Sequence, residues 1–329
     1  MANIGILGAG TWGMALARMI FRTGHATTVW SALPQEVDEL STTRKHRNLP
    51  GMVIPDGIVF TKNMEEAIQN KDVVLFAVPS VFVRSTAEKA APYLEENAVV
   101  VDVAKGLEAG TLLTMTEVIA SAVQKPLRLV ALSGPTHAEE VAVDLPTCIV
   151  AASADEAAAL YVQELFMNTC LRVYTNRDIR GVELCGAMKN VMALAAGISS
   201  GLGYGDNAKA ALITRGMAEI TRLGLAAGCE AGTFGGLAGI GDLIVTATSV
   251  HSRNNRCGQL IGQGVEPHEA VKQVGMVVEG VNALPAAMEM QKTYGVEMPL
   301  ATAVNAVVNE GADPREAVKC LMVRPGRAE

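Results

Sequence analysis

The segment Gly8-Ala9-Gly10-Thr11-Trp12-Gly13 constrains the fold of this chain more than any other stretch. Apolar residues 3–7 precede it with the pattern of a buried strand, and residues 14–20 follow it with the pattern of a helix. A G-x-G-x-x-G turn between a strand and a helix is typical of dinucleotide-binding proteins. Gly8 allows the tight turn, Gly10 lets a pyrophosphate approach the backbone, and Gly13 lets helix and strand pack closely. The segment therefore predicts a nucleotide cofactor held at a helix N-terminus.

Further apolar stretches predict a sheet behind this turn. They cover residues 26–30, 71–78, 98–103, 127–132, 147–152 and 170–174, and helical patterns separate most of them. Because several are apolar throughout, we expect a mainly parallel sheet covered by helices on both faces. From residue 182 onward the strand patterns fade. The sequence thus predicts an α/β fold with a Rossmann-type domain over residues 1–181 and an all-helical domain over residues 182–329.

Charge and composition exclude several classes of protein. The formal net charge is -7, which argues against general nucleic-acid binding. The six cysteines form no C-x-x-C pair and the five histidines have no metal-ligand spacing, so we expect reduced thiols and no metal site. The first strand leaves no room for a signal peptide, and no apolar run suits a membrane span. These features together predict a cytoplasmic protein.

Two lysines stand out as candidate catalytic residues. Lys105 comes directly after the apolar stretch 98–103, and ligands of parallel sheets bind beyond the carboxyl ends of strands. Lys189 is the only charged residue between Glu183 and Asp206. A lysine held in an apolar site can exchange a proton near neutral pH, whereas the alternative is a side chain that extends to solvent. We interpret Lys189 as the proton-transferring residue.

A second group of polar side chains suits a phosphate. Ser252, Arg253 and Asn254 combine a guanidinium with hydroxyl and amide donors, which can hold a phosphate through several charge-assisted hydrogen bonds. A solvated surface loop is the alternative interpretation of this stretch. Gly134 and Thr136 follow the strand pattern 127–132, so they are expected at the same edge of the sheet as Lys105.

A larger set of motifs resembles one enzyme family over nearly the whole chain. In order these are GAGTWG at residues 8–13, VPS at 78–80, AKGLE at 104–108, SGPTHAEE at 133–140, KN at 189–190, GDNAK at 205–209, GDL at 241–243, SRN at 252–254 and VEG at 278–280. In this order and spacing they resemble the bacterial NAD(P)-dependent sn-glycerol-3-phosphate dehydrogenases. The resemblance implies reversible reduction of dihydroxyacetone phosphate to sn-glycerol 3-phosphate for glycerophospholipid synthesis. It also implies NADPH or NADH as cofactor and a cytoplasmic homodimer.

The resemblance also implies roles for individual residues. Lys189 would be the proton donor and acceptor, with Lys105 and Asp242 as the other catalytic residues. Substrate would be bound by Lys105, Gly134, Thr136, Lys189, Asn190, Asp242, Thr246, Ser252, Arg253 and Asn254. The cofactor would contact Gly8, Gly10, Thr11, Trp12, Gly13, Ser31, Ala32, Lys105, Ala138, Arg253, Val277 and Glu279. No metal is implied.

The stretch Ser31-Ala32-Leu33 leaves the choice between NADH and NADPH open. It follows the second predicted strand, where NAD-binding domains usually place an acid and NADP-binding domains a basic residue. Neither residue type is present there. Ser31, or a residue of the stretch 44–47 folding back, could substitute for the missing basic residue.

Two other functions remain as alternatives. A 3-hydroxyacid or ketopantoate-type reductase would share the Rossmann domain, the helical domain and a catalytic lysine, but it would not need the phosphate-type cluster at residues 252–254. A non-catalytic NAD(P)-binding sensor would keep the glycine turn and would need neither Lys105 nor Lys189. Turnover of dihydroxyacetone phosphate distinguishes the sensor from the enzymes.

Overall fold

The computed structural model describes residues 1–326, which form two compact units. The first unit comprises Met1–Lys105 and Leu113–Glu183, and the second comprises Gly106–Leu112 and the chain from Leu184 onward. Residues 327–329, the end of the predicted helical domain, lie outside the described residues. The prediction of two continuous domains did not anticipate that residues 106–112 group with the second unit. The domain limits at residues 181 and 182 stay a prediction.

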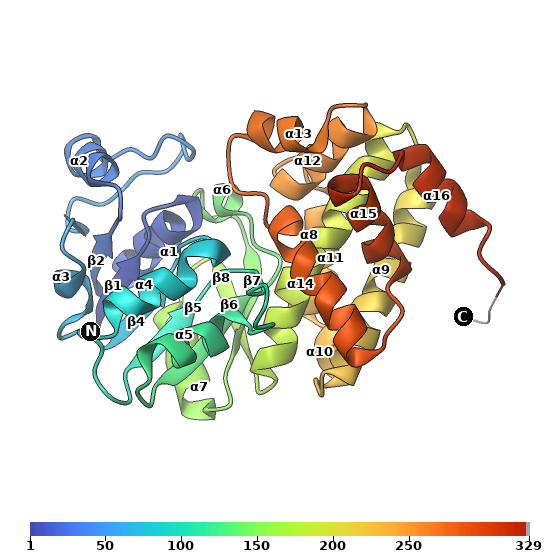
Figure 1. Cartoon of the computed structure of the whole chain (residues 1–329). Coiled ribbons are helices and arrows are strands. Elements are labelled where there is room, and N and C mark those ends of the chain that lie inside the picture. The colour runs from blue at the N-terminus through green and yellow to red at the C-terminus, as the bar shows by residue number, and fades with distance from the viewer. Residues whose placement is uncertain (327–329) are drawn as a thin grey trace. The chain divides into compact units, whose positions relative to one another are not determined.

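An eight-stranded sheet forms the first unit, in the order β3-β2-β1-β4-β5-β6-β7-β8 (Figure 1). Its strands are β1 (Asn3–Leu7), β2 (Ala26–Trp30), β3 (Val59–Thr61), β4 (Val73–Phe76), β5 (Val99–Asp102), β6 (Arg128–Ser133), β7 (Thr147–Ala152) and β8 (Leu171–Asn176). All neighbours pair in parallel except β6 and β7, which are antiparallel. The prediction of a mainly parallel sheet is confirmed. Strands β2 and β3 lie on one side of β1 and strands β4 to β8 lie on the other, so the direction of strand addition reverses at β1. The glycine turn begins where β1 ends.

Helices cover both faces of this sheet, because alternate strand residues point to opposite sides. Val73 and Leu75 of β4 pack into one hydrophobic cluster, and Val74 and Phe76 pack into another. The first cluster includes apolar residues of α1 and α7, and the second includes residues of α4 and α5. The helices of this unit are α1 (Thr11–Arg22), α2 (Pro34–Thr43), α3 (Met64–Ile68), the 3₁₀ turn η1 (Ser80–Phe82), α4 (Val83–Ala90), α5 (Met115–Val123), α6 (Ala138–Val141) and α7 (Glu156–Leu165).

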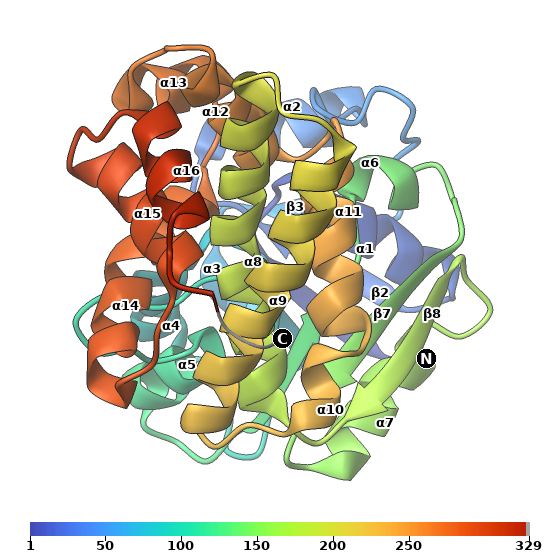
Figure 2. The same cartoon turned by 90° about the vertical axis from the view of Figure 1, so that its right-hand side faces the viewer.

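In the described part of the second unit, all the secondary-structure elements are helices (Figure 2). They are α8 (Ile179–Gly201), whose first turn belongs to the first unit, α9 (Asp206–Ala226), α10 (Ala231–Phe234), the π-helical turn η2 (Leu237–Gly241), α11 (Asp242–Thr248), α12 (Arg253–Gly262), α13 (Pro267–Val274), α14 (Glu279–Tyr294), α15 (Pro299–Asn309) and α16 (Pro314–Met322). This confirms the predicted helical region. Helix α8 is long and apolar enough to cross a membrane, but its apolar window is fully buried, as in a core helix.

Glycines bring the backbones of α8 and α12 into direct contact. A Cβ added at Gly197 would lie 2.1 Å from the carbonyl oxygen of Asn255, and one added at Gly258 would lie 2.2 Å from the carbonyl oxygen of Leu194. No larger residue fits at either position without separating the helices. This contact fixes the start of α12 relative to the helix that carries Lys189.

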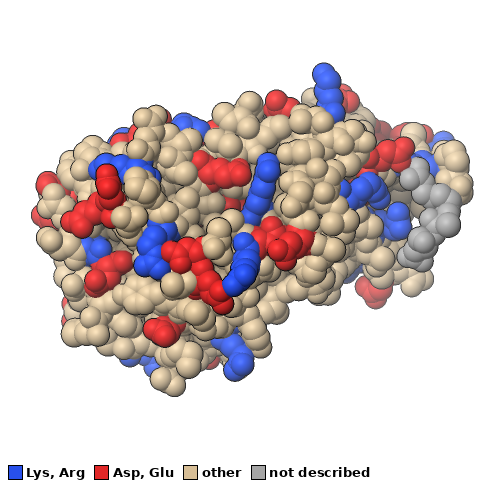
Figure 3. Space-filling view, turned by 90° about the horizontal axis from the view of Figure 1, so that it is seen from below, with Lys and Arg blue, Asp and Glu red and all other residues tan. Residues whose placement is uncertain are grey.

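Charges of both signs are mixed on one face of the protein (Figure 3). On the face in Figure 3, Lys and Arg side chains lie among Asp and Glu side chains. The ion pair between Arg128 Nε and Asp155 Oδ2 is 2.6 Å long, and both side chains are partly exposed, as in an ordinary surface ion pair. Such pairs contribute at most about 1 kcal/mol each to stability. The face shown therefore lacks the single-sign field that steers nucleic acids.

Two buried carboxyl groups anchor helix ends. Glu183 of α8 accepts hydrogen bonds from Thr114 Oγ1 at 2.8 Å and from the backbone N–H of Thr116 at 2.8 Å, both at the start of α5. Glu219 of α9 accepts from the backbone N–H of Leu300 at 2.7 Å, in the first turn of α15. Burial raises the pKa of each carboxyl from its ordinary value of 4.5 to about 7.

Replacing Glu219 by glutamine should reduce the pH dependence of the free energy of unfolding. The pKa of Glu219 is about 7 in the folded protein, against an ordinary value of 4.5. The free energy of unfolding therefore falls as the pH rises from the lower of these values through the higher one. Linkage gives a loss of about 2 kcal/mol between roughly pH 5.5 and roughly pH 8 in the wild type, which the variant should lack.

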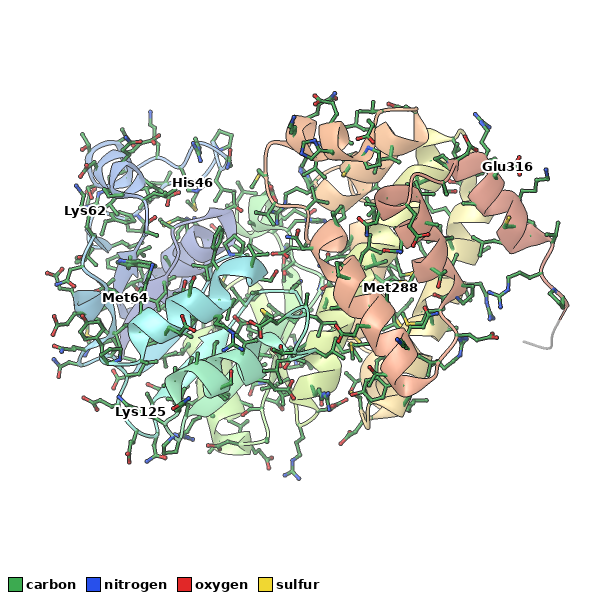
Figure 4. All side chains as sticks on the ribbon, in the orientation of Figure 1. His46, Lys62, Met64, Lys125, Met288 and Glu316 are labelled. Carbon is green, nitrogen blue, oxygen red and sulfur yellow. The ribbon has the colours of Figure 1, made fainter. Side chains whose placement is uncertain are left out.

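Urea unfolding at both pH values measures this difference. The control is Glu316→Gln, which changes an exposed glutamate of α16 (labelled in Figure 4) and should keep the pH dependence of the wild type. Glu183 contributes in the same direction in every variant. An unchanged pH dependence in Glu219→Gln would contradict the assignment.

Candidate active site

The glycine turn between β1 and α1 has the shape that a pyrophosphate requires. Gly8 has φ +122°, and its N–H donates to the carbonyl of Trp30, 2.8 Å away. A Cβ at Gly8 would lie 2.6 Å from the carbonyl oxygen of Ala77, and a Cβ at Gly13 would lie 2.3 Å from that of Gly8. A Cβ at Gly10 would meet no atom within 4 Å, so this glycine faces open space. The residues present therefore fit a dinucleotide.

The other predicted cofactor residues of the first unit lie at the carboxyl ends of strands or in the helices that follow. Thr11 and Trp12 are half-buried in the first turn of α1, whose unpaired N–H groups favour an anion. Ser31 is buried directly after β2, and Ala32 is exposed beside it. Ala138 is the first residue of α6 and is buried.

Lys105 links the ends of two neighbouring strands. Its Nζ donates to the carbonyl oxygen of Gly134 at 2.9 Å, and Thr136 Oγ1 donates to the same oxygen at 3.2 Å. The structure thus brings these three predicted substrate residues together. Ser133 Oγ, at the end of β6, is buried with no hydrogen-bond partner among residues 1–326. Ser133 was not among the predicted site residues, although its place beside Gly134 was a usable signal.

Lys189 lies inside the second unit with two polar partners. Its Nζ is 2.8 Å from Asp242 Oδ1 and 2.5 Å from Thr246 Oγ1, both in α11. The exposed fractions of the Lys189 and Asp242 side chains are 7% and 1%. Thr246 Oγ1 donates to the backbone carbonyl of Asp242 at 2.7 Å. The lone pairs of the Thr246 hydroxyl oxygen can therefore accept from the Lys189 ammonium. The carboxylate stabilises the ammonium form that a proton donor needs, while burial acts against it.

The turn before Asp242 has a rare helical geometry. Residues 237–241 form the π-helical turn η2, a geometry that is frequent at functional sites. A Cβ at Gly239 would lie 2.1 Å from the carbonyl oxygen of Phe234, so only glycine fits. The glycine-rich sequence at this point therefore sets the position of the Asp242 carboxylate.

A buried amide network connects three helices of the second unit. Asn254 Nδ2 donates to Asn190 Oδ1 at 2.9 Å, and the N–H of Gly280 donates to Asn254 Oδ1 at 2.8 Å. Each member directly follows a predicted site residue in the sequence: Asn190 follows Lys189, Asn254 follows Arg253, and Gly280 follows Glu279. The network holds α8, α12 and α14 in a fixed register. Asn190 and Asn254 can thus position the site even where they do not contact substrate.

The predicted phosphate cluster lies at the N-terminus of α12. Ser252 is the N-cap residue, and its Oγ accepts from the N–H of Asn255 at 3.2 Å. Arg253 is half-buried at the first helical position. The unpaired N–H groups of this first turn add to the positive charge of the guanidinium. The remaining predicted cofactor residues, Val277 and Glu279, are half-buried at the start of α14.

Comparison with known families gives two matches that together span most of the chain. The model of the NAD-dependent glycerol-3-phosphate dehydrogenase N-terminus matches residues 3–159, and the model of its C-terminus matches residues 178–319.

Individual relatives are similar along their whole length. A glycerol-3-phosphate dehydrogenase [NAD(P)+] 2 of Lactobacillus delbrueckii subsp. bulgaricus is 64% identical, over 100% of this chain and 99% of the relative. A glycerol-3-phosphate dehydrogenase [NAD(P)+] of Agathobacter rectalis is 49% identical, over 100% and 98%. The crystal structure of a glycerol-3-phosphate dehydrogenase from Coxiella burnetii matches with a TM-score of 0.94 and 36% identity, over 98% of this chain and 99% of that one.

Proposed function

This chain belongs to the NAD-dependent glycerol-3-phosphate dehydrogenase family, and we propose that Lys189 is the proton donor of its reaction. The enzyme is an NAD(P)-dependent oxidoreductase that interconverts dihydroxyacetone phosphate and sn-glycerol 3-phosphate. The observation that carries the proposal for Lys189 is its buried contact with Asp242 and Thr246, at 2.8 and 2.5 Å. A buried, carboxylate-paired ammonium has little structural use in an apolar helix, because burying an ion pair costs desolvation free energy.

The proposed roles follow from what each side chain can donate. When bound, the nicotinamide cofactor supplies the hydride for the carbonyl carbon of the ketone. Lys189 then donates a proton from Nζ to the substrate oxygen, and it takes that proton back in the oxidation direction. Asp242 holds the ammonium charged and oriented, and Thr246 fixes its direction. Lys105, in the first unit, is proposed to bind substrate and to stabilise developing negative charge on its oxygen.

Phosphate recognition is proposed for the N-terminus of α12. Arg253 offers a planar pair of N–H donors, and the backbone N–H groups of the first turn point the same way along the helix axis. Ser252 and Asn254, which flank Arg253 in the sequence, are proposed to complete the phosphate site. Gly134 and Thr136 are proposed to contact the substrate from the first unit.

We further propose a cytoplasmic homodimer that supplies sn-glycerol 3-phosphate for glycerophospholipid synthesis. The six cysteines are free thiols, which suits a reducing compartment. Light scattering on the purified protein measures the oligomeric state directly.

Turnover of defined ketones tests the proposed function. Oxidation of NADH and NADPH is followed with dihydroxyacetone phosphate, unphosphorylated dihydroxyacetone and ketopantoate at matched concentrations. We expect turnover with the phosphorylated ketone and far slower turnover with the other two, because they lack the group that Arg253 binds. Efficient turnover of ketopantoate, or no preference for the phosphorylated ketone, would overturn the assignment of substrate.

A further inference from the structure

We propose that Glu36 makes the adenosine end of the cofactor site select NADH over NADPH. The inference rests on the proposed function only in using the same dinucleotide site. It concerns the end of β2, where the stretch Ser31-Ala32-Leu33 contains neither the acid that indicates NADH nor the base that indicates NADPH. The structure supplies an acid at this point from a residue further along the chain.

The end of β2 lies directly beside the glycine turn. Leu7 of β1 pairs with Trp30 of β2, and the carbonyl of Trp30 accepts the hydrogen bond of the Gly8 N–H. Ser31, the next residue, is therefore one peptide away from the turn that holds the pyrophosphate. In dinucleotide-binding folds the adenosine ribose lies at this strand end, where an acid accepts hydrogen bonds from its 2′-hydroxyl.

Glu36 reaches back to this strand end from α2. Ser31 Oγ donates to Glu36 Oε2 at 2.5 Å and accepts from the N–H of Leu33 at 3.1 Å. Ser31 is 6% exposed, so its hydroxyl holds the half-buried Glu36 carboxylate at the sheet edge instead of in bulk solvent. Pro34, at the first helical position, sets the start of the helix that allows this approach. The second carboxylate oxygen can accept from a ribose hydroxyl.

Two cations near this strand end, Arg44 and Lys62, are bonded to other groups. Arg44 stacks over the ring of Phe60, with 5.2 Å between its Cζ and the ring centroid, and donates to the carbonyl of Ile58. Lys62 forms an ion pair with Asp38 at 2.6 Å.

His46, labelled with Lys62 in Figure 4, is the residue that folds back onto the glycine turn. It is 5% exposed and hydrogen-bonds with the backbone of Ala9. Burial lowers the pKa of His46 below its ordinary value of 6.5, so the ring is neutral at neutral pH. A dianionic 2′-phosphate would therefore meet the Glu36 carboxylate without a compensating charge from His46 or Arg44.

Direct binding of the reduced cofactors tests this inference. Kd values for NADH and NADPH are measured by nicotinamide fluorescence without substrate. We expect the wild type to bind NADH about 30-fold more tightly, since like-charge repulsion of moderate strength has this effect at a partly exposed site. Glu36→Gln keeps the shape and the hydrogen-bond acceptor but removes the charge. Its preference should fall to about threefold, mainly through tighter NADPH binding.

Glu39→Gln is the matched control. Glu39 is exposed one turn further along α2 and its side chain does not bond Ser31, so we expect a preference within twofold of the wild type. Raising the salt concentration should weaken the wild-type preference and leave that of Glu36→Gln nearly unchanged, because salt screens exposed charges. Arg47→Ala, on the loop that carries His46, should leave NADPH binding unaltered.

Equal affinity of the wild type for both cofactors, or an unchanged preference in Glu36→Gln, would overturn the inference. A loss of NADPH affinity in Arg47→Ala would also overturn it, because a cation would then hold the 2′-phosphate. The titrations need no turnover. A protein that prefers NADH but fails to reduce dihydroxyacetone phosphate would refute the proposed function alone.

Discussion

Replacement of Lys189 by alanine is expected to lower kcat for dihydroxyacetone phosphate about 10⁴-fold, because it removes both the proton donor and a charge beside the reacting oxygen. The Kd for NADH, measured by fluorescence, should stay within about twofold, since an interaction made mainly in the transition state is lost. Lys272→Ala, an exposed lysine of α13, is the control and should keep wild-type kinetics. A near-normal kcat in Lys189→Ala would show that another group donates the proton.

Alanine at this position also leaves Asp242 as a buried charge without its cation, which costs about 3–5 kcal/mol. Lys189→Arg separates this effect from the chemistry. The guanidinium keeps a charge beside Asp242, so the thermal melting temperature should stay near that of the wild type, but it is a poor proton donor because its pKa exceeds about 12. We therefore expect a folded and inactive variant. Added ethylammonium should restore part of the activity of Lys189→Ala by occupying the space of the missing amine.

The fold could be predicted where hydrophobic patterns are local. Strands of a covered parallel sheet are apolar throughout, and the limits of β1, β2 and β7 agree with the stretches identified in the sequence. Strand β3 was missed, because three residues at the sheet edge carry too little pattern. The antiparallel direction of β7 could not be read from its residues, since strand direction depends on the connection and not on the strand itself.

Parts of the candidate site were predictable for a different reason. Lys189 stands out in the sequence because it is the only charged residue between Glu183 and Asp206, and such an exception to local pattern is where functional residues are expected. Its partner Asp242 is 53 residues away along the chain, so no local pattern indicates this contact. The family resemblance named Asp242 without giving this distance.

Glu36 shows what a local search misses. An acid or a base was expected directly after the second strand, where Ser31-Ala32-Leu33 stands instead. The acid comes five residues after Ser31, and a helix start at Pro34 returns it to the strand end. A pattern defined by sequence position cannot detect a residue that occupies the same place in space from the next element.

Replacement of Arg253 by alanine is expected to raise the KM for dihydroxyacetone phosphate about 10²–10³-fold, because a charge-assisted bidentate contact with phosphate is lost. Arg253→Lys should give an intermediate KM, since it keeps the charge without the planar pair of donors. The Ser252 cap of α12 remains, so folding should be unaffected, and Arg315→Ala on exposed α16 serves as control.

The decisive comparison uses substrates with and without the phosphate. If Arg253 contacts that group, the variant should lose activity toward dihydroxyacetone phosphate but turn over unphosphorylated dihydroxyacetone as slowly as the wild type does. The two substrates and the two proteins form a double-mutant cycle. Removing the phosphate from the substrate and removing the guanidinium from the protein each abolish the same contact between arginine and phosphate. Equal losses with both substrates would mean that Arg253 acts on the cofactor or on the helix, and the phosphate site would then lie elsewhere.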